Sequence, residues 1–351
     1  MPATVIVGGQ FGSEGKGKVT SLTASRMRSP WVVRCGGPNS GHSIWINGKP
    51  CVLRQLPVAA PQHDARLAIA AGSVVDEDLL IEEIKLLGVP RHRIIVDARA
   101  VLISPQDRDG EQSLVAQIGS TGSGTGAAAA RRLLRSGDVR LVGDSKRITE
   151  FATIGTVGPH LHTALDRGEE VVVEGTQGFG LSLFHGRGFP YLTSKDTTAS
   201  AFASEVGLAP HDINEVILVV RTFPIRVGGP SGDLDDEVSW QFVQEKSNAP
   251  EEELEFTSVT QRLRRVAQFD LELVRTACRY NGPTSIAVMG LDRLDHANRG
   301  VKDRHELSQA ALSFLEKLRE DLNIPISWVG TGFSTCDAID LSTRATEFSH
   351  A

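Results

Sequence analysis

Residues 4–18 have the sequence TVIVGGQFGSEGKGK, and this stretch decides the fold class that we expect. The first four residues are apolar or β-branched, as in a buried β-strand, and a segment rich in glycine and lysine follows. An amphipathic helical pattern then covers residues 17–27. A strand, a glycine loop and a helix in this order predict a phosphate site. Glycines let backbone N–H groups approach phosphate oxygens, and the helix N-terminus favours anions.

The glycine loop differs from both common nucleotide-binding motifs. Five residues separate Gly9 from Gly15, whereas the Walker A motif has about four, and Gly17 stands where that motif has its magnesium-binding Ser or Thr. The Rossmann pattern GxGxxG does not fit either. The alternative is a glycine-rich turn with surface lysines, but five glycines and two lysines within residues 8–18 exceed what a turn requires.

Short apolar segments alternate with helical patterns along the chain. We expect strands at residues 4–7, 31–34, 67–70, 94–96, 171–173, 216–220, 285–289 and 326–329. We expect helices at residues 17–27, 76–87, 127–135, 197–206, 269–281 and 306–322. This alternation predicts an α/β fold with a mostly parallel, doubly wound sheet, flanking helices and inserted lobes, in one domain over residues 1–351. Asn47-Gly48 separates two short β-branched segments and predicts a tight hairpin.

The composition is that of an ordinary globular protein. Apolar residues make up 40% and charged residues 23% of the chain, which allows a sizeable core. A formal charge of −6 argues against a nucleic-acid partner. We expect no signal peptide and no membrane partner, because no apolar run approaches membrane-spanning length. The four cysteines lie far apart and fit neither a disulfide framework nor a zinc site, so we expect a cytoplasmic protein.

Further polar segments follow predicted strands, at the edge where ligands of open α/β sheets collect. Residues 34–42 (RCGGPNSGH) place His42 near the phosphate loop; a lone histidine is more often structural, but the neighbouring glycines favour a functional one. Residues 118–126 (IGSTGSGTG) lead into a helix with three arginines and predict a second anion site, the alternative being a flexible linker. Residues 174–178 (EGTQG) and 191–194 (YLTS) offer amide and hydroxyl groups.

Two charged segments lie in the second half of the chain. Residues 257–265 (TSVTQRLRR) contain three arginines, whose planar forks match carboxylates and phosphates. A solvated basic stripe is the alternative. Residues 248–255 (NAPEEELE) are acidic and predict a solvated surface loop.

Several of these segments together resemble the adenylosuccinate synthetase family. They are QFGSEGKGK (10–18), NSGH (39–42), IGSTG (118–122), EGTQG (174–178) and RLRR (262–265), and they occur in the family's order over nearly the whole chain. The chain is short for the family and resembles its compact, archaeal-like branch. The resemblance implies a carbon–nitrogen ligase: a base removes the purine N1 proton, O6 attacks the γ-phosphate, and the amine of aspartate displaces the resulting 6-phosphoryl group.

The resemblance also implies the residues of the site, a Mg²⁺ ion and a homodimer. The implied catalytic residues are Ser13, Lys16, His42 and Gln177. Those for the triphosphate are Gly12, Ser13, Glu14, Gly15, Lys16, Gly17, Lys18, Asp292, Gly330 and Gly332. Those for the purine monophosphate are Ser13, Asn39, Ser120, Thr121, Gln177, Thr193, Val227 and Arg135, the last from the partner subunit. Val259, Thr260, Arg262 and Arg264 match the loop that binds L-aspartate, and Ser13 and Gly41 match the metal ligands.

Ser13 departs from the family pattern. The family has the run Trp-Gly-Asp-Glu-Gly-Lys-Gly-Lys, in which the aspartate is base and magnesium ligand, whereas this chain has Ser13 at that position. A smaller, neutral hydroxyl beside N1 and C2 makes room for a C2 amino group, which guanine has and hypoxanthine lacks. A phage-encoded branch of the family carries this serine and converts dGMP to N6-succino-2-amino-2′-deoxyadenylate for 2-aminoadenine DNA. The chain resembles that branch, which would place it in the host cytoplasm.

A second departure concerns the nucleoside triphosphate. Met289-Gly290-Leu291-Asp292 stands where family members have Thr-Lys-Leu-Asp for guanine recognition. Loss of the lysine weakens guanine selection, so we expect ATP or dATP, with GTP as the alternative. Two other functions stay open: adenylosuccinate synthesis from IMP with GTP, and a catalytically inactive nucleotide-binding homologue.

Overall fold

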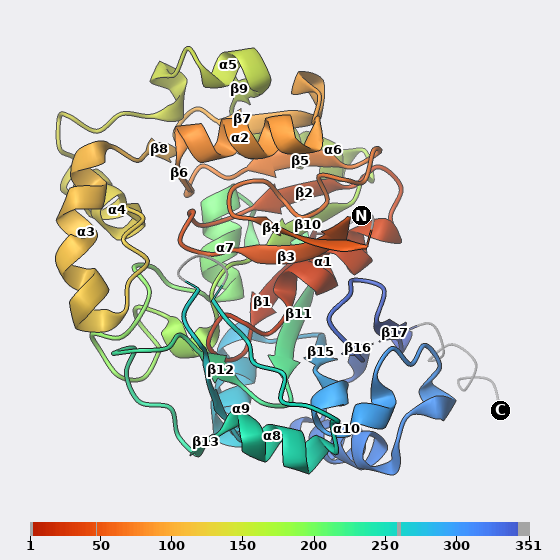
Figure 1. Cartoon of the computed structure of the whole chain (residues 1–351). Coiled ribbons are helices and arrows are strands. Elements are labelled where there is room, and N and C mark those ends of the chain that lie inside the picture. The colour runs from red at the N-terminus through yellow and green to blue at the C-terminus, as the bar shows by residue number, and fades with distance from the viewer. Residues whose placement is uncertain (1–2, 47, 258–260, 343–351) are drawn as a thin grey trace.

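A ten-stranded sheet forms the centre of the molecule in the computed structural model, which describes residues 3–46, 48–257 and 261–342 (Figure 1). The strand order is β17-β16-β15-β11-β1-β10-β2-β5-β7-β9. Adjacent strands run parallel except β16 and β17. Their bounds are β1 Ala3–Gly8, β2 Trp31–Arg34, β5 Arg66–Ile69, β7 Ile94–Asp97, β9 Thr153–Gly155, β10 Val171–Glu174, β11 Ile213–Arg221, β15 Ser285–Met289, β16 Ile326–Gly330 and β17 Ala338–Asp340. The predicted mostly parallel α/β sheet is confirmed; β9 and β17 were not predicted.

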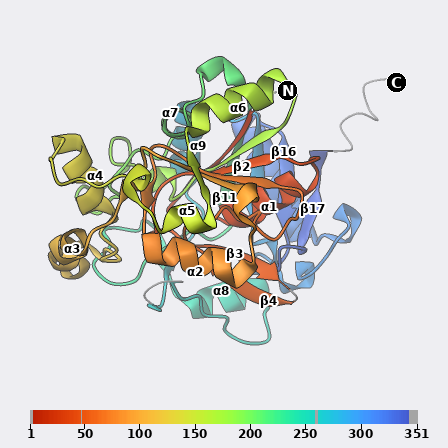
Figure 2. The ribbon, with the colours of Figure 1, turned by 90° about the horizontal axis from the view of Figure 1, so that it is seen from above.

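The described chain has helices on both faces of this sheet and in lobes beside it. They are α1 Lys16–Ser25, α2 Glu77–Leu87, α3 Pro105–Ile118, α4 Thr125–Leu134, α5 Ile148–Phe151, α6 Val157–Asp166, α7 Ala199–Val206, α8 Trp240–Ser247, α9 Leu271–Asn281 and α10 Gln309–Leu322. Figure 2 shows α6 and α7 on one side of the sheet and α2 on the other. The six predicted helices are present, whereas α3, α5, α6 and α8 were not predicted.

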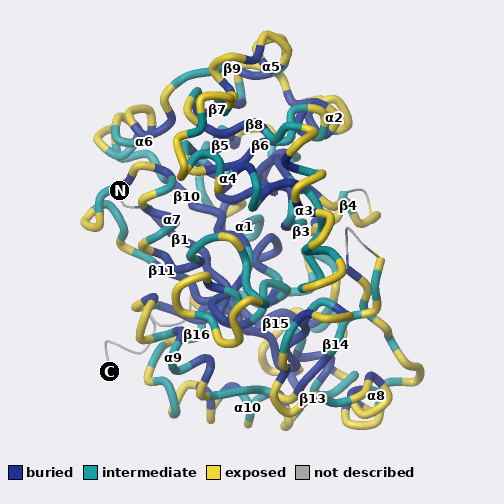
Figure 3. The backbone as a smooth tube through the Cα atoms, turned by 90° about the vertical axis from the view of Figure 1, so that its left-hand side faces the viewer, coloured by how far each residue is buried: buried dark blue, intermediate teal, exposed yellow. Residues whose placement is uncertain are grey.

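The core has two halves because successive strand residues point to opposite faces. On β1, Val5 and Val7 belong to the cluster that packs against α6, α7, α9 and α10, whereas Ile6 belongs to the cluster that includes α1 and α2. In Figure 3 the buried backbone runs through the middle of the molecule and the exposed backbone lies outside it. No helix in the described part of the chain is long and apolar enough to cross a membrane.

A hairpin covers the outer side of α1. It consists of β3 (His42–Ile46) and β4 (Lys49–Leu53), which pair antiparallel. The predicted hairpin is therefore confirmed; Gly48 has a φ of +76°, and Asn47 lies outside the described residues. The prediction that the helix after the glycine loop is amphipathic is wrong. Seven of its ten residues are buried, because the hairpin packs on the side that would otherwise face water.

Smaller elements form lobes beyond the large sheet. Helices α3 and α4 pack together at one side of the molecule, next to a short pair of strands, β6 (Val74–Val75) and β8 (Val101–Leu102) (Figure 1). A second lobe contains α8 and a three-stranded sheet of β12 (Ile225–Arg226), β14 (Arg265–Ala267) and β13 (Glu237–Val238). These lobes stand beside the carboxyl ends of the central strands, where they enclose the site.

Candidate active site

The carboxyl ends of the central parallel strands meet at one edge of the sheet. The glycine loop follows β1, which lies between β11 and β10. Arg221 ends β11, Glu174 ends β10 and Arg34 ends β2. The crevice beside such strand ends is the usual ligand site of an open α/β sheet. The polar segments that the sequence singled out are therefore brought together by the parallel topology.

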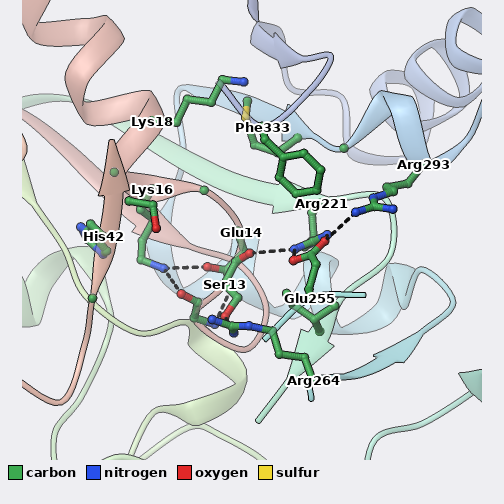
Figure 4. A pocket seen from close by; sticks show the side chains of 18 of the residues that line it. Ser13, Glu14, Lys16, Lys18, His42, Arg221, Glu255, Arg264, Arg293 and Phe333 are labelled. Atoms are coloured by element: carbon green, nitrogen blue, oxygen red, sulfur yellow. Dashed lines mark hydrogen bonds and ion pairs between the residues drawn. The ribbon is translucent and has the colours of Figure 1, made fainter. Parts of the chain in front are cut away.

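A cavity of about 400 Å³ lies at this edge; we call it the larger cavity (Figure 4). The predicted site residues that line it are Gly12, Ser13, Glu14, Gly15, Lys16, Gly17, Lys18, Gly41, His42, Arg264, Asp292 and Gly332. It also contains Phe333 and three side chains that the sequence analysis missed, namely Arg221, Glu255 and Arg293. Cationic groups dominate its wall, which suits a highly charged anion such as a triphosphate.

A buried carboxylate holds the glycine loop in shape. Oε1 of Glu14 accepts hydrogen bonds from the backbone N–H groups of Gln10 (3.0 Å) and Gly12 (2.7 Å). Its Oε2 lies 2.7 Å from Nζ of Lys16, which also donates to the Gly12 carbonyl oxygen at 3.0 Å. Both side chains are almost fully buried. The loop therefore bends around the Glu14–Lys16 ion pair. This bend directs the N-terminus of α1 toward the cavity.

Gly17 lets α1 approach the hairpin that carries His42. A Cβ at position 17 would stand only 2.7 Å from Cβ of His42, so any side chain there would push strand β3 away. This close approach explains why a glycine stands where the Walker A motif has a hydroxyl residue. It also keeps His42 beside Lys16 on the wall of the larger cavity.

His42 is buried and bound to a carboxylate. Its Nδ1 lies 2.5 Å from Oε1 of Glu174, and Nη1 of Arg34 donates to the same oxygen at 2.5 Å. Burial, assisted by the charge of Arg34, lowers the pKa of His42 from 6.5 to about 4. Burial alone would raise the pKa of Glu174, but Arg34 and His42 outweigh it and the pKa lies below its ordinary value. The imidazole is therefore neutral near pH 7, with its proton on Nδ1 facing the carboxylate.

A row of alternating charges closes the far side of the larger cavity. Nη2 of Arg221 lies 2.6 Å from Oε1 of Glu255, and Nη2 of Arg293 lies 3.4 Å from the same oxygen. Burial opposes ionisation of Glu255, but Arg221 holds its pKa at about 2. Glu253 pairs with Arg293 (3.0 Å). Residues 248–255 form the predicted surface loop, with most of its residues exposed, but Glu253 and Glu255 pair with the arginines of the cavity.

Ser13 is hydrogen-bonded to Arg264, the arginine that the sequence analysis assigned to the binding of L-aspartate. Nη1 of Arg264 donates to Oγ of Ser13, and Nη1 of Arg221 donates to the Ser13 carbonyl oxygen at 3.3 Å. Nε of Arg264 donates to the Phe256 carbonyl oxygen at 3.1 Å. The glycine loop and the predicted aspartate loop thus meet at the Ser13–Arg264 contact, shown in Figure 4.

Lys18 forms hydrogen bonds with the segment that follows β16. Its Nζ donates to the carbonyl oxygens of Gly332 (2.9 Å) and Asp337 (2.6 Å), and burial lowers its pKa to about 8. Asp292 is buried nearby, and burial raises its pKa. Gly290 has a φ of +82°, and its carbonyl oxygen accepts a bond of 2.6 Å from Oγ1 of Thr222.

A second cavity of about 280 Å³, the smaller cavity, adjoins the first. The predicted residues that line it are Asn39, Ser120, Thr121, Gln177, Thr193 and Val227. The two cavities meet where Gly12 packs against Gln177, since a Cβ at Gly12 would lie 3.1 Å from Cα of Gln177. Arg226 and Phe11, which the sequence analysis missed, also line it, and the guanidinium of Arg226 lies 5.0 Å from the Phe11 ring centroid.

The N-terminus of α4 already has an anion from its own chain. Glu111 accepts hydrogen bonds from the N–H groups of Gly124 (2.8 Å), Gly126 (2.5 Å) and Ala127 (3.1 Å). The sequence predicted that the N-terminus of α4 binds an external anion. In the structure the carboxylate of Glu111 on α3 binds these N–H groups instead. Ser120 and Thr121, which precede α4 in the chain, line the smaller cavity.

Some predicted site residues lie away from both cavities. Arg135 ends α4 on the exposed surface, beside the exposed Leu133 and Leu134. Gly330 packs behind the larger cavity against Met289. Arg262 shapes its loop, where its N–H donates to Oγ1 of Thr257 (2.9 Å) and its carbonyl oxygen accepts from the Thr257 N–H (2.9 Å). Val259 and Thr260 lie outside the described residues.

Three charged residues of the site had a signal in the sequence. The carboxyl end of an apolar strand is an unusual place for a charged residue unless it faces a ligand or a partner, and this is where Arg34, Glu174 and Arg221 lie.

The fold and the two cavities together define an α/β enzyme that handles nucleotide phosphates.

The comparisons with known proteins identify the family. The model of the family "Adenylosuccinate synthetase" matches residues 5–149 and 145–299. The adenylosuccinate synthetase of Methanocaldococcus jannaschii is 42% identical over 97% of both chains, and that of Thermococcus sibiricus is 40% identical over 97% of this chain and 99% of its own. The chain belongs to the adenylosuccinate synthetase family, and it is a carbon–nitrogen ligase.

Two solved structures resemble this one over nearly their whole length. The fully ligated adenylosuccinate synthetase from Plasmodium falciparum gives a TM-score of 0.86 at 20% identity and covers 97% of this chain and 100% of its own, which shows the shared fold. The cyanophage S-2L succinoaminodeoxyadenylate synthetase (PurZ), bound to dGMP and to dATP as energy donor, gives a TM-score of 0.79 at 27% identity, with coverage of 98% and 96%.

Proposed function

We propose that this ligase joins L-aspartate to C6 of dGMP and hydrolyses a nucleoside triphosphate in doing so. The product would be N6-succino-2-amino-2′-deoxyadenylate. The observation that carries the proposal is Ser13, a neutral hydroxyl on the glycine loop where the family pattern has a carboxylate. Ser13 lines the larger cavity next to Gly12, which abuts Gln177 of the smaller one. A small side chain at this junction leaves space for a C2 amino group.

The two cavities suit the two nucleotides of this reaction. We assign the smaller cavity to the purine monophosphate, with Gln177, Ser120 and Thr121 as hydrogen-bonding groups, and the larger cavity to the triphosphate. O6 would attack the γ-phosphorus at their junction and release the nucleoside diphosphate. The amine of aspartate, held by Arg264, would then attack C6 and expel inorganic phosphate. The nearby cations Lys16 and Arg221 stabilise the negative charge that develops on the phosphates.

Mg²⁺ fits the larger cavity as a companion of the triphosphate. Ser13 and Gly41 line the cavity and offer a hydroxyl and a carbonyl oxygen. The described residues include no group of three His, Cys, Asp or Glu side chains that could hold a metal by themselves. A few protein oxygens completed by phosphate oxygens and water are typical of Mg²⁺. When bound there, the ion would neutralise charge on the transferred phosphoryl group.

We propose ATP or dATP as the phosphate donor. Gly290 places no side chain against the base, while the buried Asp292 keeps a hydrogen-bond acceptor in the cavity. The cyanophage PurZ, which resembles this chain, is bound to dATP as energy donor and to dGMP. That likeness supports both parts of the proposal.

The second candidate is adenylosuccinate synthesis from IMP with GTP. A specific observation favours it: the curated relatives that are 37–42% identical to this chain over nearly its whole length are named adenylosuccinate synthetases. These relatives support the second candidate more strongly than the 27% identical PurZ supports dGMP. The choice between the two substrates therefore depends on Ser13.

A substrate panel tests the proposal. Phosphate release is measured with L-aspartate, Mg²⁺ and each pairing of dGMP, GMP or IMP with ATP, dATP or GTP. We expect the highest kcat/KM with dGMP and with ATP or dATP. A higher kcat/KM with IMP and GTP would establish the second candidate instead. Absence of phosphate release in every pairing would show a catalytically inactive homologue.

A further inference from the structure

One buried arginine of the site has no carboxylate to neutralise it. Arg226, the last residue of β12, is 3% exposed and lines the smaller cavity, yet no carboxylate in the described part of the chain forms an ion pair with it. A buried charge without a partner is costly. The other buried arginines each pair with a glutamate: Arg34 with Glu174, Arg221 with Glu255 and Arg293 with Glu253.

Arg226 also has hydrogen-bond donors that remain unused. Its Nη1 donates to the Asp233 carbonyl oxygen and its Nη2 to the Tyr191 carbonyl oxygen, both at 2.7 Å. Its Nε is buried and has no hydrogen-bond partner among the described residues. A guanidinium carries more N–H groups than these bonds use. The carbonyl groups therefore position the side chain and leave donors free for a ligand.

The charged groups around Arg226 leave its positive charge in place. Burial, together with the charge of Arg265 on β14, lowers the pKa of Arg226 to about 10, so the guanidinium stays cationic near pH 7. Arg265 is itself paired with Glu237 at 2.5 Å. Asp233 is an exposed residue, so water and salt screen its carboxylate. Glu111 lines the same cavity, but its carboxylate binds the N-terminus of α4.

Arg226 lies at the end of the smaller cavity that faces the larger cavity. Its guanidinium carbon lies 5.0 Å from the ring centroid of Phe11. Phe11 directly precedes Gly12, which abuts Gln177 where the two cavities meet. The proposed reaction requires the purine O6 at this junction, so the 5′-phosphate would point the other way, toward residues 120–121. The positive charge of Arg226 is therefore placed for the base of the nucleotide.

We propose that Arg226 is a catalytic residue that stabilises the purine anion formed when N1 loses its proton. In this step the N1–H bond breaks, its electron pair stays on the purine and is shared with O6, and the proton passes to solvent water. An opposite charge within about 4–6 Å lowers the pKa of an acid by about 1–3. A lowered N1 pKa supplies a nucleophilic O6 without a carboxylate base, which Ser13 cannot provide. The proposal rests on the proposed function only in that the smaller cavity holds the purine with its base at the junction.

The pKa of N1 in the bound nucleotide tests this role. The ultraviolet absorbance of a purine changes when N1 loses its proton. A pH titration of the whole protein with dGMP or IMP, corrected for the protein alone, therefore gives this pKa without triphosphate or aspartate. In the wild type we expect the N1 pKa to lie below that of the free nucleotide by about one or more. In Arg226→Gln it should equal or exceed the free value, because the cation is gone and burial remains. Arg226→Lys keeps the charge and should keep most of the decrease.

Arg265→Gln is the matched control, because it removes a neighbouring positive charge from a residue that lines neither cavity. It should leave the N1 pKa of the bound nucleotide at the wild-type value. With all substrates present, the rise of kcat with pH should move to higher pH in Arg226→Gln and stay in place in Arg265→Gln.

Two results would overturn the proposal: an N1 pKa in the wild type that equals that of the free nucleotide, or an equal decrease in Arg226→Gln. Weaker binding by Arg226→Gln with the wild-type N1 pKa would assign Arg226 to the 5′-phosphate and also overturn it. Because both nucleotides are titrated, the result does not depend on whether dGMP or IMP is the substrate. Failure of both to bind the wild type would refute the assignment of the smaller cavity in the proposed function.

Discussion

Nδ1 of His42, the first residue of β3, lies 2.5 Å from Oε1 of Glu174, the last residue of β10, and both side chains are buried. Arg34 binds the same carboxylate oxygen. The carboxylate therefore sets which imidazole nitrogen carries the proton and fixes the ring against the cavity wall. Nε2 of His42 has no hydrogen-bond partner among the described residues, so it is the nitrogen left for the substrates.

We predict that His42→Ala lowers kcat by about a hundredfold or more, because the free Nε2 of the neutral imidazole can take up a proton in the transition state, and a positioned acid–base group contributes about 10²–10⁴-fold. Glu174→Gln should lower kcat by about tenfold or more, since loss of an orienting carboxylate misplaces the imidazole proton. Steady-state kinetics with saturating substrates measures both effects. The matched control is Glu83→Gln, because Glu83 is a buried carboxylate that accepts three backbone bonds and lines neither cavity. Equal kcat for Glu174→Gln and wild type would refute the assigned role.

Stability should fall as the solution becomes acidic. In the folded protein His42 stays neutral down to about pH 4, whereas in the unfolded chain it takes up a proton near 6.5. The unfolded state therefore binds more protons between these values, and the free energy of unfolding decreases as pH drops, by up to about 1.4 kcal/mol per pH unit for one group. Glu255, whose pKa is about 2 when folded, adds a further decrease below its ordinary value of 4.5.

Urea unfolding at a series of pH values measures this dependence. His42→Gln should flatten it between about pH 6.5 and 4, because the group that titrates is gone. His211→Gln serves as control, since His211 is 86% exposed. A His42→Gln profile parallel to that of the wild type would mean that another group is responsible.

Ser13→Asp should shift substrate preference from dGMP toward IMP. If the hydroxyl accepts a hydrogen bond from the C2 amino group, IMP leaves a buried polar group unpaired, which costs ~1–3 kcal/mol and gives roughly a 5- to 150-fold preference for dGMP. The aspartate side chain would crowd that amino group. The measurement is the ratio of kcat/KM for the two substrates.

Ser13→Ala separates space from hydrogen bonding at this position. It keeps the room for the amino group but removes the acceptor, so its ratio should fall between those of wild type and Ser13→Asp. A partial reversal in Ser13→Asp still agrees with the prediction. An unchanged ratio, or equal use of IMP and dGMP by the wild type, would show that Ser13 does not select the base at C2.

Arg135 is predicted to act in the site of a partner subunit of a homodimer. It ends α4 on the surface and lines neither cavity of its own chain. Arg135→Ala and Lys16→Ala should each be poorly active alone. Mixed after dissociation, they should regain about a quarter of wild-type activity, because half of the dimers are hybrids with one intact site. Failure of the mixture to regain activity, or full activity in a monomer measured by light scattering, would contradict the prediction.

The sequence by itself determined eight strands of the central sheet, six of the helices and the place of the glycine loop. Residues 4–18 contain a complete local signal, because strand, glycine turn and helix start depend on neighbouring residues. The same holds for the hairpin at Gly48, whose positive φ is a property of glycine. Helix α3 was missed although its capping box, Ser104 with Asp107, is also local.

Only the tertiary structure decided which charges compensate one another. The sequence placed Glu255 in a solvated acidic loop. In the structure it binds Arg221, which ends β11 and lies 34 residues earlier in the sequence. The pairing of Arg34 with Glu174 arises because β2 and β10 are adjacent in a parallel sheet, and the loop after β2 then brings His42, 132 residues from Glu174 in sequence, to the same carboxylate. Burial then sets the protonation of both groups. Such long-range pairings depend on sheet order and desolvation, neither of which a linear pattern of residues contains.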